Sequence, residues 1–549
     1  MIGISFALTD CVVFIAVFEA TGNERVCISL NPCPPLTEPY KITKCRHFRS
    51  RALQRFAPMA SSARPRTISK ESLIMSESAT TPKAADSTSM AEITGTVPTT
   101  ILSKEFVQTV GRFAYVWGWP IASSFNRRAA MTSSPEPGLR GGILPNAPLG
   151  YVCMLTDYLS ADQRFVTCSN QDVAYGFGYG SLDDDPVIMQ VPDFGDRFWV
   201  YAAWDARTDA FAELGRQYGT TPGFYLMVGP HWSGKPPAGI SGIFRSSTEL
   251  AAFCPGVFLN DTGEDRKAIL PVLNQVMVYP LREFDGKTKT KDWKQVPTFP
   301  ASGPQSQEDI HWVNPDTFFD QLPHLLNHVP PLPGEEAIYA TLRAVLEAAS
   351  EDPQVMQSLK EAAAASEKEL IAPLIRWRLN GPPAGNGWYS PRNNGAFGVD
   401  YAVRTAVAKS NMYENRFNET KFIFTDTDSE HQLLHGNSQY AITFPAGQLP
   451  PVHAFWSLTL YNDHHFFHPN PLKRFSLGTK NRTLQTNSDG SLTLYAGAAM
   501  PGIEKATNWL PAPAGPFSLY IRCYWPKPEV INASWIPPKV MKISWVGSA

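Results

Sequence analysis

The sequence predicts a mainly β protein with two β-sandwich or jelly-roll-like domains joined by a helical block. Pro and Gly are abundant, at 48 and 38 of the 549 residues, which favours short strands and tight turns. Segments with apolar residues at every second position occur in two separate regions, and a stretch rich in Ala, Glu, Lys and Leu lies between them. We therefore expect a β domain over residues 101–300, helices over 301–380 and a second β domain over 381–549.

The first β domain is expected to begin with a helix. Ser103 can cap the run KEFVQTVGRFAYVWGW, and Pro120 is expected to end it. Four apolar side chains fall on one stripe of this helix: Phe106, Val110, Phe113 and Trp117. The segments PVIMQVP, RFWVYAAWD, FYLMVGP and VMVYPL then read as strands bounded by Pro, Gly and Asp.

The middle of the chain predicts three helices between residues 315 and 379, because Ala, Glu, Lys and Leu dominate and Pro353 stands at a helix start. The last part returns to period-two segments, namely QYAITFP, HAFWSLTLY, SLTLYAG and FSLYIRCYW. Their spacing and the turn residues between them are typical of a sandwich or jelly roll.

Residues 1–100 have a different composition, rich in Ser, Thr, Ala and Pro near their end. We expect a disordered leader or a mis-assigned start, with Met59, Met75 and Met90 as other starts. The apolar run CVVFIAVFEA is too short to span a bilayer. The expected location is cytoplasmic, or secreted or organellar if the leader is a targeting segment.

Charge and cysteine content exclude several classes of protein. The net charge of −2 gives no basic field for nucleic acid. The eight cysteines include no CxxC pair, so a zinc knuckle or a thioredoxin-like pair is not expected. No cofactor motif is visible, and we expect neither a cofactor nor a metal. A homo-oligomer is left open.

Two strands near the end of the chain each offer a face with hydroxyl groups and aromatic rings. In HAFWSLTLY the face includes Ser457 and Tyr461, and in FSLYIRCYW it holds Tyr520, Arg522 and Tyr524. The opposite face of FSLYIRCYW, from Phe517 to Trp525, is expected to lie in the core. Rings, hydroxyls and a guanidinium on one face suit sugars or carboxylates, although a solvated sheet face is an alternative.

The first β domain offers a similar face in RFWVYAAWD. Arg197, Trp199, Tyr201 and Asp205 alternate with apolar residues there. Just upstream, the segment SNQDVAYG supplies three polar side chains: Asn170, Asp172 and Tyr175.

Four other segments resemble known motifs without completing them. GPHWSGKP lacks the hydroxyl and the helix of a phosphate loop, because Pro236 and Pro237 follow Lys235. HLLNH and HQLLH have the spacing of zinc ligands on a helix but no Glu of an HExxH site. YNDHHFFHPNP holds His464, His465 and His468, which we expect to be incidental to a strand end.

Longer stretches resemble a known pair of domains. SNQD and QVPDFGDRFWVYAAWDARTDAF are similar to DUF1254, and FPAGQLPPVHAFWSLTLYN and NWLPAPAGPFSLYIRCYWP are similar to DUF1214. The resemblance implies two β-sandwich-like domains joined by helices, and little about function. The family's Asn-x-Asp pattern falls on Asn170 and Asp172, but Val173 stands where the family usually has Thr. Its Pro-Asp…Arg pattern includes Arg197.

Two functions are therefore expected as alternatives. The first is a cofactor-independent hydrolase or lyase for a small polar or carbohydrate-like substrate bound between the β domains, where ligand sites are common. Asp172 would be its acid or base, and Arg197 and Arg522 would hold an anion. Substrate-binding side chains would be Asn170, Tyr175, Asp205, Tyr461, Tyr520 and Tyr524. The second function is a module that binds a glycan or a partner protein without chemistry.

Overall fold

The computed structural model describes residues 2–8, 11–17, 26–30, 102–301 and 311–544. The chain divides into two compact units, residues 1–84 and 85–549. In the first unit the strands β1 (Ile2–Leu8), β2 (Cys11–Val17) and β3 (Val26–Leu30) form an antiparallel sheet. These stretches depart from the expected disorder, since apolar β-branched residues favour strands. The rest of the expected leader lies outside the described residues.

The first β domain of the second unit is a sandwich of two four-stranded sheets. One sheet has the order β11-β10-β8-β13 and the other β6-β7-β12-β9. The first comprises β8 (Val187–Val191), β10 (Gly223–Val228), β11 (Ile240–Arg245) and β13 (Met277–Pro280). The second comprises β6 (Cys153–Met154), β7 (Val173–Ser181), β9 (Trp199–Asp205) and β12 (Leu250–Phe258). Buried apolar residues from both sheets form one core, which α3 (Gly263–Leu273) extends.

Strand β7 shows how this domain gains two different faces. Its sequence alternates aromatic residues with glycines, as in Tyr175-Gly-Phe-Gly-Tyr-Gly180. A Cβ atom at Gly178 would lie 2.0 Å from the carbonyl oxygen of Tyr151, so only glycine allows the neighbouring chain to approach this closely. The aromatic rings are left to the opposite face.

A small three-stranded sheet, β14-β4-β5, accompanies this sandwich. It comprises β4 (Gly138–Arg140), β5 (Leu144–Asn146) and β14 (Thr298–Phe299).

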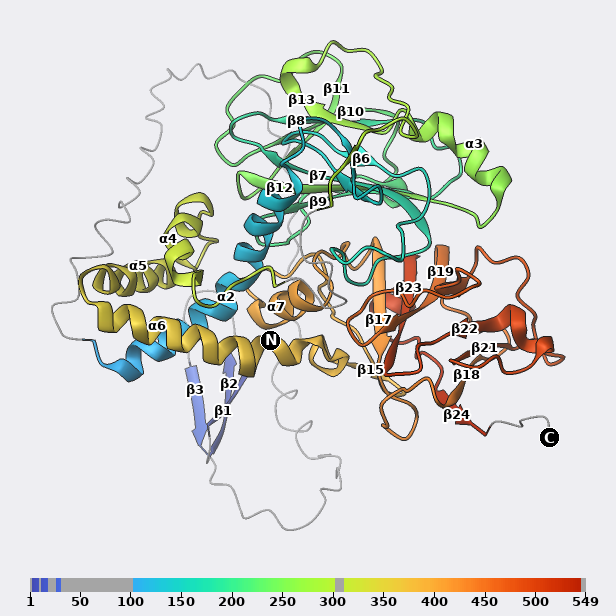
Figure 1. Cartoon of the computed structure of the whole chain (residues 1–549). Helices are drawn as coiled ribbons and strands as arrows, with labels where there is room; N and C mark the ends of the chain where they lie inside the picture. The colour runs from blue at the N-terminus through green and yellow to red at the C-terminus, as the bar shows by residue number, and fades with distance from the viewer. Residues whose placement is uncertain (1, 9–10, 18–25, 31–101, 302–310, 545–549) are drawn as a thin grey trace, which may run out of the picture. The chain divides into compact units, whose positions relative to one another are not determined.

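Helix α2 (Lys104–Met131) lies among the helices of the middle block (Figure 1). These are α4 (Phe318–His328), α5 (Glu336–Glu351) and α6 (Pro353–Ser366), followed by short π and 3-10 turns to Leu379, and α7 (Tyr401–Ser410). The three helices expected between residues 315 and 379 are confirmed. Ser103 caps α2 as expected, since its hydroxyl oxygen accepts the Phe106 N–H at 3.2 Å.

Two expectations for α2 are wrong. The helix continues through Pro120 to Met131. Proline removes the donor that the Val116 carbonyl would otherwise accept, and the Thr405 hydroxyl of α7 donates to this carbonyl instead, at 2.8 Å. The expected stripe is also wrong at Phe106 and Phe113, which are exposed.

The buried face of α2 contains small residues. A Cβ at Gly111 would be 3.0 Å from the Cβ of Ala362, and one at Gly118 would be 2.8 Å from the Phe318 ring. The neighbouring helices therefore pack closely against these glycines, which a pattern of large apolar residues does not reveal.

The second β domain is a sandwich of a six-stranded sheet, β15-β16-β17-β23-β19-β20, and a four-stranded sheet, β22-β21-β18-β24. The larger sheet comprises β15 (Pro383–Gly385), β16 (Trp388–Tyr389), β17 (Thr420–Thr425), β19 (Val452–Asn462), β20 (Ser476–Gly478) and β23 (Phe517–Pro526). The smaller comprises β18 (Gln439–Phe444), β21 (Leu492–Gly497), β22 (Trp509–Pro511) and β24 (Val540–Ile543). A short helix, α8 (Pro528–Ile531), follows β23. The expected largely β fold with a helical block is confirmed.

Both faces of the larger sheet are buried. Leu458 and Ile521 belong to the core between the two sheets, whereas Tyr520 and Tyr524 belong to clusters that include residues of the first β domain. The alternative of a solvated face is therefore wrong, because Ser457, Tyr461, Tyr520, Arg522 and Tyr524 are all buried. The polar faces expected on β19 and β23 pack against the first β domain.

Candidate functional site

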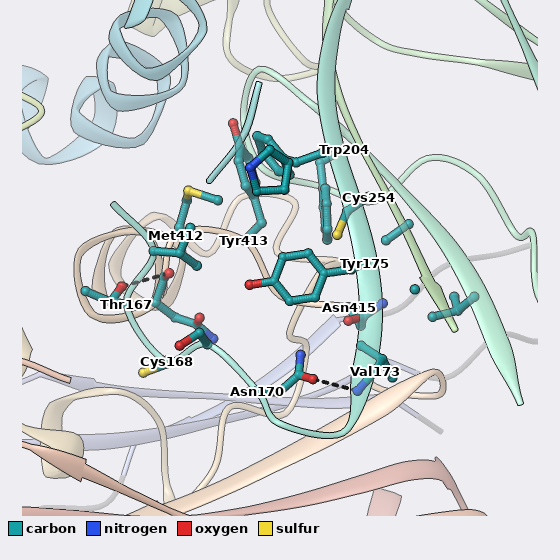
Figure 2. A pocket seen from close by; sticks show the side chains of 18 of the residues that line it. Thr167, Cys168, Asn170, Val173, Tyr175, Trp204, Cys254, Met412, Tyr413 and Asn415 are labelled. Atoms are coloured by element: carbon teal, nitrogen blue, oxygen red, sulfur yellow. Dashed lines mark hydrogen bonds between the residues drawn. The ribbon is translucent and has the colours of Figure 1, made fainter. Parts of the chain in front are cut away.

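A cavity of about 110 Å³ lies where the two β domains and the helical block meet (Figure 2). None of its lining residues is exposed. The first domain contributes side chains from β5, β7, β9 and β12 and from the loop 166–170, α2 contributes Met131, and the rest come from the loop 411–415 and from β17 and β23. Most of the wall is apolar: Met131, Leu144, Pro145, Val166, Val173, Phe177, Val200, Ala202, Trp204, Met412 and Phe422.

Arg522 is the charged residue of the wall, and it is 3% exposed. Its NH2 group donates to the hydroxyl of Tyr461 at 2.6 Å and to the carbonyl of Cys168. The guanidinium also lies 4.5 Å from the ring centre of Tyr520. In the part of the chain that the structure describes, no carboxylate lies within ion-pair distance of it and its buried Nε has no hydrogen-bond partner. Arg522 is therefore buried without a carboxylate partner among the described residues, and it faces the cavity.

Tyr175 extends from β7 into the middle of the cavity, toward the side on which Thr167 and Cys168 lie (Figure 2). Its hydroxyl is buried and has no hydrogen-bond partner among the described residues. Burial raises the pKa of this phenol well above its ordinary value. The hydroxyl therefore keeps its proton and can donate a hydrogen bond to a guest in the cavity.

Asn170 also lines the cavity, and it holds the start of β7 in place. Its Oδ1 accepts the backbone N–H groups of Asp172 at 3.1 Å and Val173 at 3.0 Å. Burial raises the pKa of the Cys254 thiol, another lining group, to about 12. This thiol is therefore a poor nucleophile near neutral pH.

Asp172 points away from the cavity and joins the two β domains. Its carboxylate is fully buried and lies 3.2 Å from the ammonium of Lys480. It accepts a hydrogen bond from Ser457 at 2.6 Å, with Tyr524 and Ser476 each 3.4 Å away. The role of acid or base predicted for Asp172 is not favoured, because its oxygens are occupied and it is absent from the cavity wall.

Arg197 and Asp205 also lie apart from the cavity. Arg197 forms a two-pronged pair with Asp265 at 2.6 and 2.8 Å. Asp205 accepts the Ser247 hydroxyl at 2.5 Å and two backbone N–H groups. On β9 the residues with even numbers, such as Val200 and Trp204, face the cavity, whereas Trp199 and Tyr201 lie in the core of the sandwich.

The three other predicted tyrosines surround Arg522. Tyr461 donates to the carbonyl of Ser169 at 2.5 Å. Tyr520 donates to Glu414 at 3.2 Å, and Tyr524 lines the cavity. The structure therefore brings together most of the predicted residues of the second domain, but separates them from Arg197 and Asp205.

Glu414 is a buried carboxyl that the sequence analysis did not single out. Its Oε1 accepts Asn411 at 3.0 Å and Tyr520 at 3.2 Å, while Oε2 is buried and has no partner among the described residues. Burial raises the pKa of this carboxyl to about 7. Its segment, NMYENRF, has no period that distinguishes it from a loop, whereas the Tyr-Gly-Phe-Gly-Tyr-Gly alternation of β7 was a visible signal.

The three histidines near residue 465 do not converge. His465 is buried and stacks on Trp377 with ring centres 4.0 Å apart, while His464 is half-buried. Within residues 102–301 and 311–544, no group of three or more His, Cys, Asp or Glu side chains is arranged to hold a metal ion. His431 and His435 are not on a helix, and a strand rather than a helix follows GPHWSGKP. Of the described helices, none has the length and apolar character needed to cross a bilayer.

Comparison with family models gives two matches. Residues 150–280 match DUF1254 and residues 419–528 match DUF1214, each described as a protein of unknown function. The chain carries a DUF1254 domain and a DUF1214 domain. The DUF1254 match spans most of the first sandwich, including β7, β9 and β12, and the DUF1214 match contains β17, β19 and β23.

The chain is similar to two solved structures, of which the first supports the fold alone. The crystal structure of the VPA0106 protein from Vibrio parahaemolyticus is 20% identical, with a TM-score of 0.55, and the match covers 80% of this chain and 100% of that one. An uncharacterized protein from Burkholderia cenocepacia is 10% identical, with a TM-score of 0.39, over 79% of this chain and 89% of that one. A comparison with curated proteins found no match.

Proposed function

We propose that this DUF1254/DUF1214 protein binds a small carboxylic acid, as its anion, in the cavity between its β domains. The observation that supports this most strongly is the buried guanidinium of Arg522 on an otherwise neutral wall. A buried charge without a counter-ion is costly. A carboxylate in the cavity would offset that cost and would accept hydrogen bonds from Arg522 and from the unpartnered hydroxyl of Tyr175.

The size and polarity of the cavity limit which acids it can hold. A cavity of about 150 Å³ is known to hold benzene, and this one has about 110 Å³. Its ligand is therefore a branched acid of about four or five carbons, whose apolar body contacts side chains such as Val200 and Trp204. A carbohydrate-like substrate does not suit this cavity, since a sugar ring is larger and would leave its hydroxyls against an apolar wall.

Binding is favoured over the hydrolase or lyase. Either reaction needs a group that takes up a proton near neutral pH. None of the lining residues is an Asp, Glu, His or Lys, and burial keeps Tyr175 and the Cys254 thiol protonated. The cavity wall thus supplies a cation and neutral donors, which are the requirements for holding an anion.

Calorimetric titration of the full chain with isobutyrate tests the proposal, with neutral isobutyramide as the matched ligand. We expect isobutyrate to bind and isobutyramide to bind at least tenfold more weakly. Tyr175→Phe should weaken isobutyrate binding by roughly tenfold or more, since a hydrogen bond to a charged group contributes about 1.5–3 kcal/mol. Its stability should not fall, because the hydroxyl has no partner within the described chain.

Tyr179→Phe is the control, because Tyr179 stands on the same strand and does not line the cavity. The affinity of the Tyr179→Phe variant for isobutyrate should match that of the wild type. Arg522→Lys should also weaken binding, because an ammonium cannot reproduce the planar donor pattern. Equal affinity for the acid and the amide, or no binding of either, would refute the proposal.

A further inference from the structure

We propose that a second site, a groove between the two β domains, binds a neutral saccharide. The groove has a volume of about 570 Å³, within the usual range for ligand sites. The DUF1254 domain contributes Phe258 and Asn260, and the DUF1214 domain contributes His453, Phe455 and Trp525. No residue lines both the groove and the cavity. Phe455 of the groove stacks on Tyr524 of the cavity, with ring centres 4.0 Å apart.

Trp525 has an unusual backbone conformation that turns its ring into the groove. Its φ is +49°, although it is a bulky residue and precedes Pro526. Residues before proline favour extended conformations, and a positive φ is rare for large side chains. Strand alternation places Trp525 in the core with Cys523, and that expectation is wrong, because Trp525 lines the groove instead. Strained residues of this kind cluster at functional sites.

The groove combines a largely polar surface with the partly exposed rings of Phe258 and Trp525 and the exposed ring of His453. The rings of His453 and Trp525 lie 5.1 Å apart and are inclined by 44°. Phe258 and Phe455 lie 4.2 Å apart beside them. Rings set between polar groups suit the two surfaces of a sugar, whose C–H face packs on an aromatic ring while its hydroxyls form hydrogen bonds.

The charges of the groove favour a neutral ligand. The guanidinium of Arg197 is paired with Asp265, and that of Arg216 donates to Asp196 at 3.0 Å and to the Gly195 carbonyl at 2.6 Å. Both cations therefore already have a carboxylate partner. Asn260 and Thr479 add neutral polar groups at the edge. The groove therefore differs in chemistry from the cavity, where a single cation faces apolar residues.

The test uses three neutral trisaccharides, namely maltotriose, cellotriose and chitotriose, with trigalacturonate as the charged comparison. Binding to the full chain is followed by saturation-transfer NMR and by titration of tryptophan fluorescence. We expect at least one neutral trisaccharide to bind saturably, and to bind more tightly than trigalacturonate. Trp525→Gly should weaken it at least tenfold, because the ring is lost while glycine accepts a positive φ without strain.

His453→Ala is a second variant, since His453 is exposed and its loss should affect folding little. The His453→Ala variant should also bind the saccharide more weakly than the wild type. Trp232→Ala, which removes a tryptophan outside the groove, is the control and should bind like the wild type. The proposal fails if no neutral trisaccharide binds, or if binding is unchanged in both Trp525→Gly and His453→Ala. Isobutyrate binding should be unaffected by His453→Ala, which separates this test from that of the cavity.

Discussion

Replacing Glu414 by Gln should stabilise the protein above pH 7. Burial raises the pKa of this carboxyl to about 7 from the ordinary 4.5. The folded chain therefore binds more protons than the unfolded chain between pH 4.5 and 7, and the free energy of unfolding falls as the pH rises through this window. The accumulated loss is about 3 kcal/mol, at 1.36 kcal/mol for each pKa unit. A Gln side chain does not titrate, so the Glu414→Gln variant does not lose this stability as the pH rises.

The geometry supports this substitution. A Gln oxygen can accept from Asn411 and Tyr520 as Oε1 does, and its NH2 group falls where Oε2 has no partner among the described residues. Urea unfolding at pH 4.5 and pH 8 should show equal stability at the lower pH and a gain of about 3 kcal/mol at the higher.

Glu419 is a matched control for Glu414. It is fully buried, and burial also raises its pKa to about 7. Both of its oxygens already accept, from Tyr218 at 2.9 Å and from Asn415 at 3.2 Å. The NH2 group of Gln would meet a donor there, so Glu419→Gln should gain less stability at pH 8 than Glu414→Gln. If Glu414→Gln is no more stable than the wild type at pH 8, the account of this buried carboxyl is wrong.

Three further predictions concern stability and metal content. Lys480→Met and Asp172→Asn should each lower the free energy of unfolding by about 3–5 kcal/mol, and the double variant by less than the sum, as a double-mutant cycle would measure. Additive losses would contradict the pairing. Gly178→Ala should lower the melting temperature of the chain by several degrees, since its Cβ would meet a carbonyl oxygen at 2.0 Å; an unchanged melting temperature would refute the close approach. His465→Gln should lower the stability of the protein, because the stack of its ring on Trp377 is lost, and should leave the zinc content unchanged in elemental analysis. A loss of stoichiometric zinc in this variant would show that His465 binds metal.

The alternation of side chains between the two faces of a strand predicted the part of the site that the second domain supplies. Strand β23 has one apolar face and one face with Tyr520, Arg522 and Tyr524, and period two separates them without ambiguity. The same rule found the faces of β9 but assigned the wrong one to the site, because both faces are buried and polarity does not distinguish them. Trp204, which faces the cavity, looked like an ordinary core residue.

Other features depended on contacts between distant segments. The continuation of α2 past Pro120 requires the Thr405 hydroxyl, which is far away in the sequence. Asp172 was expected to do chemistry, and only its neighbours Lys480 and Ser457 identify it as a buried ion-pair partner. Local patterns therefore gave the strands and the polar faces, whereas the pairing of charges followed from the tertiary fold.

The ion pair between Asp172 and Lys480 has a consequence for separating the two domains. Each half of the chain holds one charge whose partner is in the other half. A DUF1214 domain made alone would expose to water an ammonium, a guanidinium and the aromatic face of β23, all of which the intact chain buries. Such a surface is an aggregation hazard. Each of the two family models therefore describes half of a shared interior, and gene fragments that express one match without the other should yield insoluble protein.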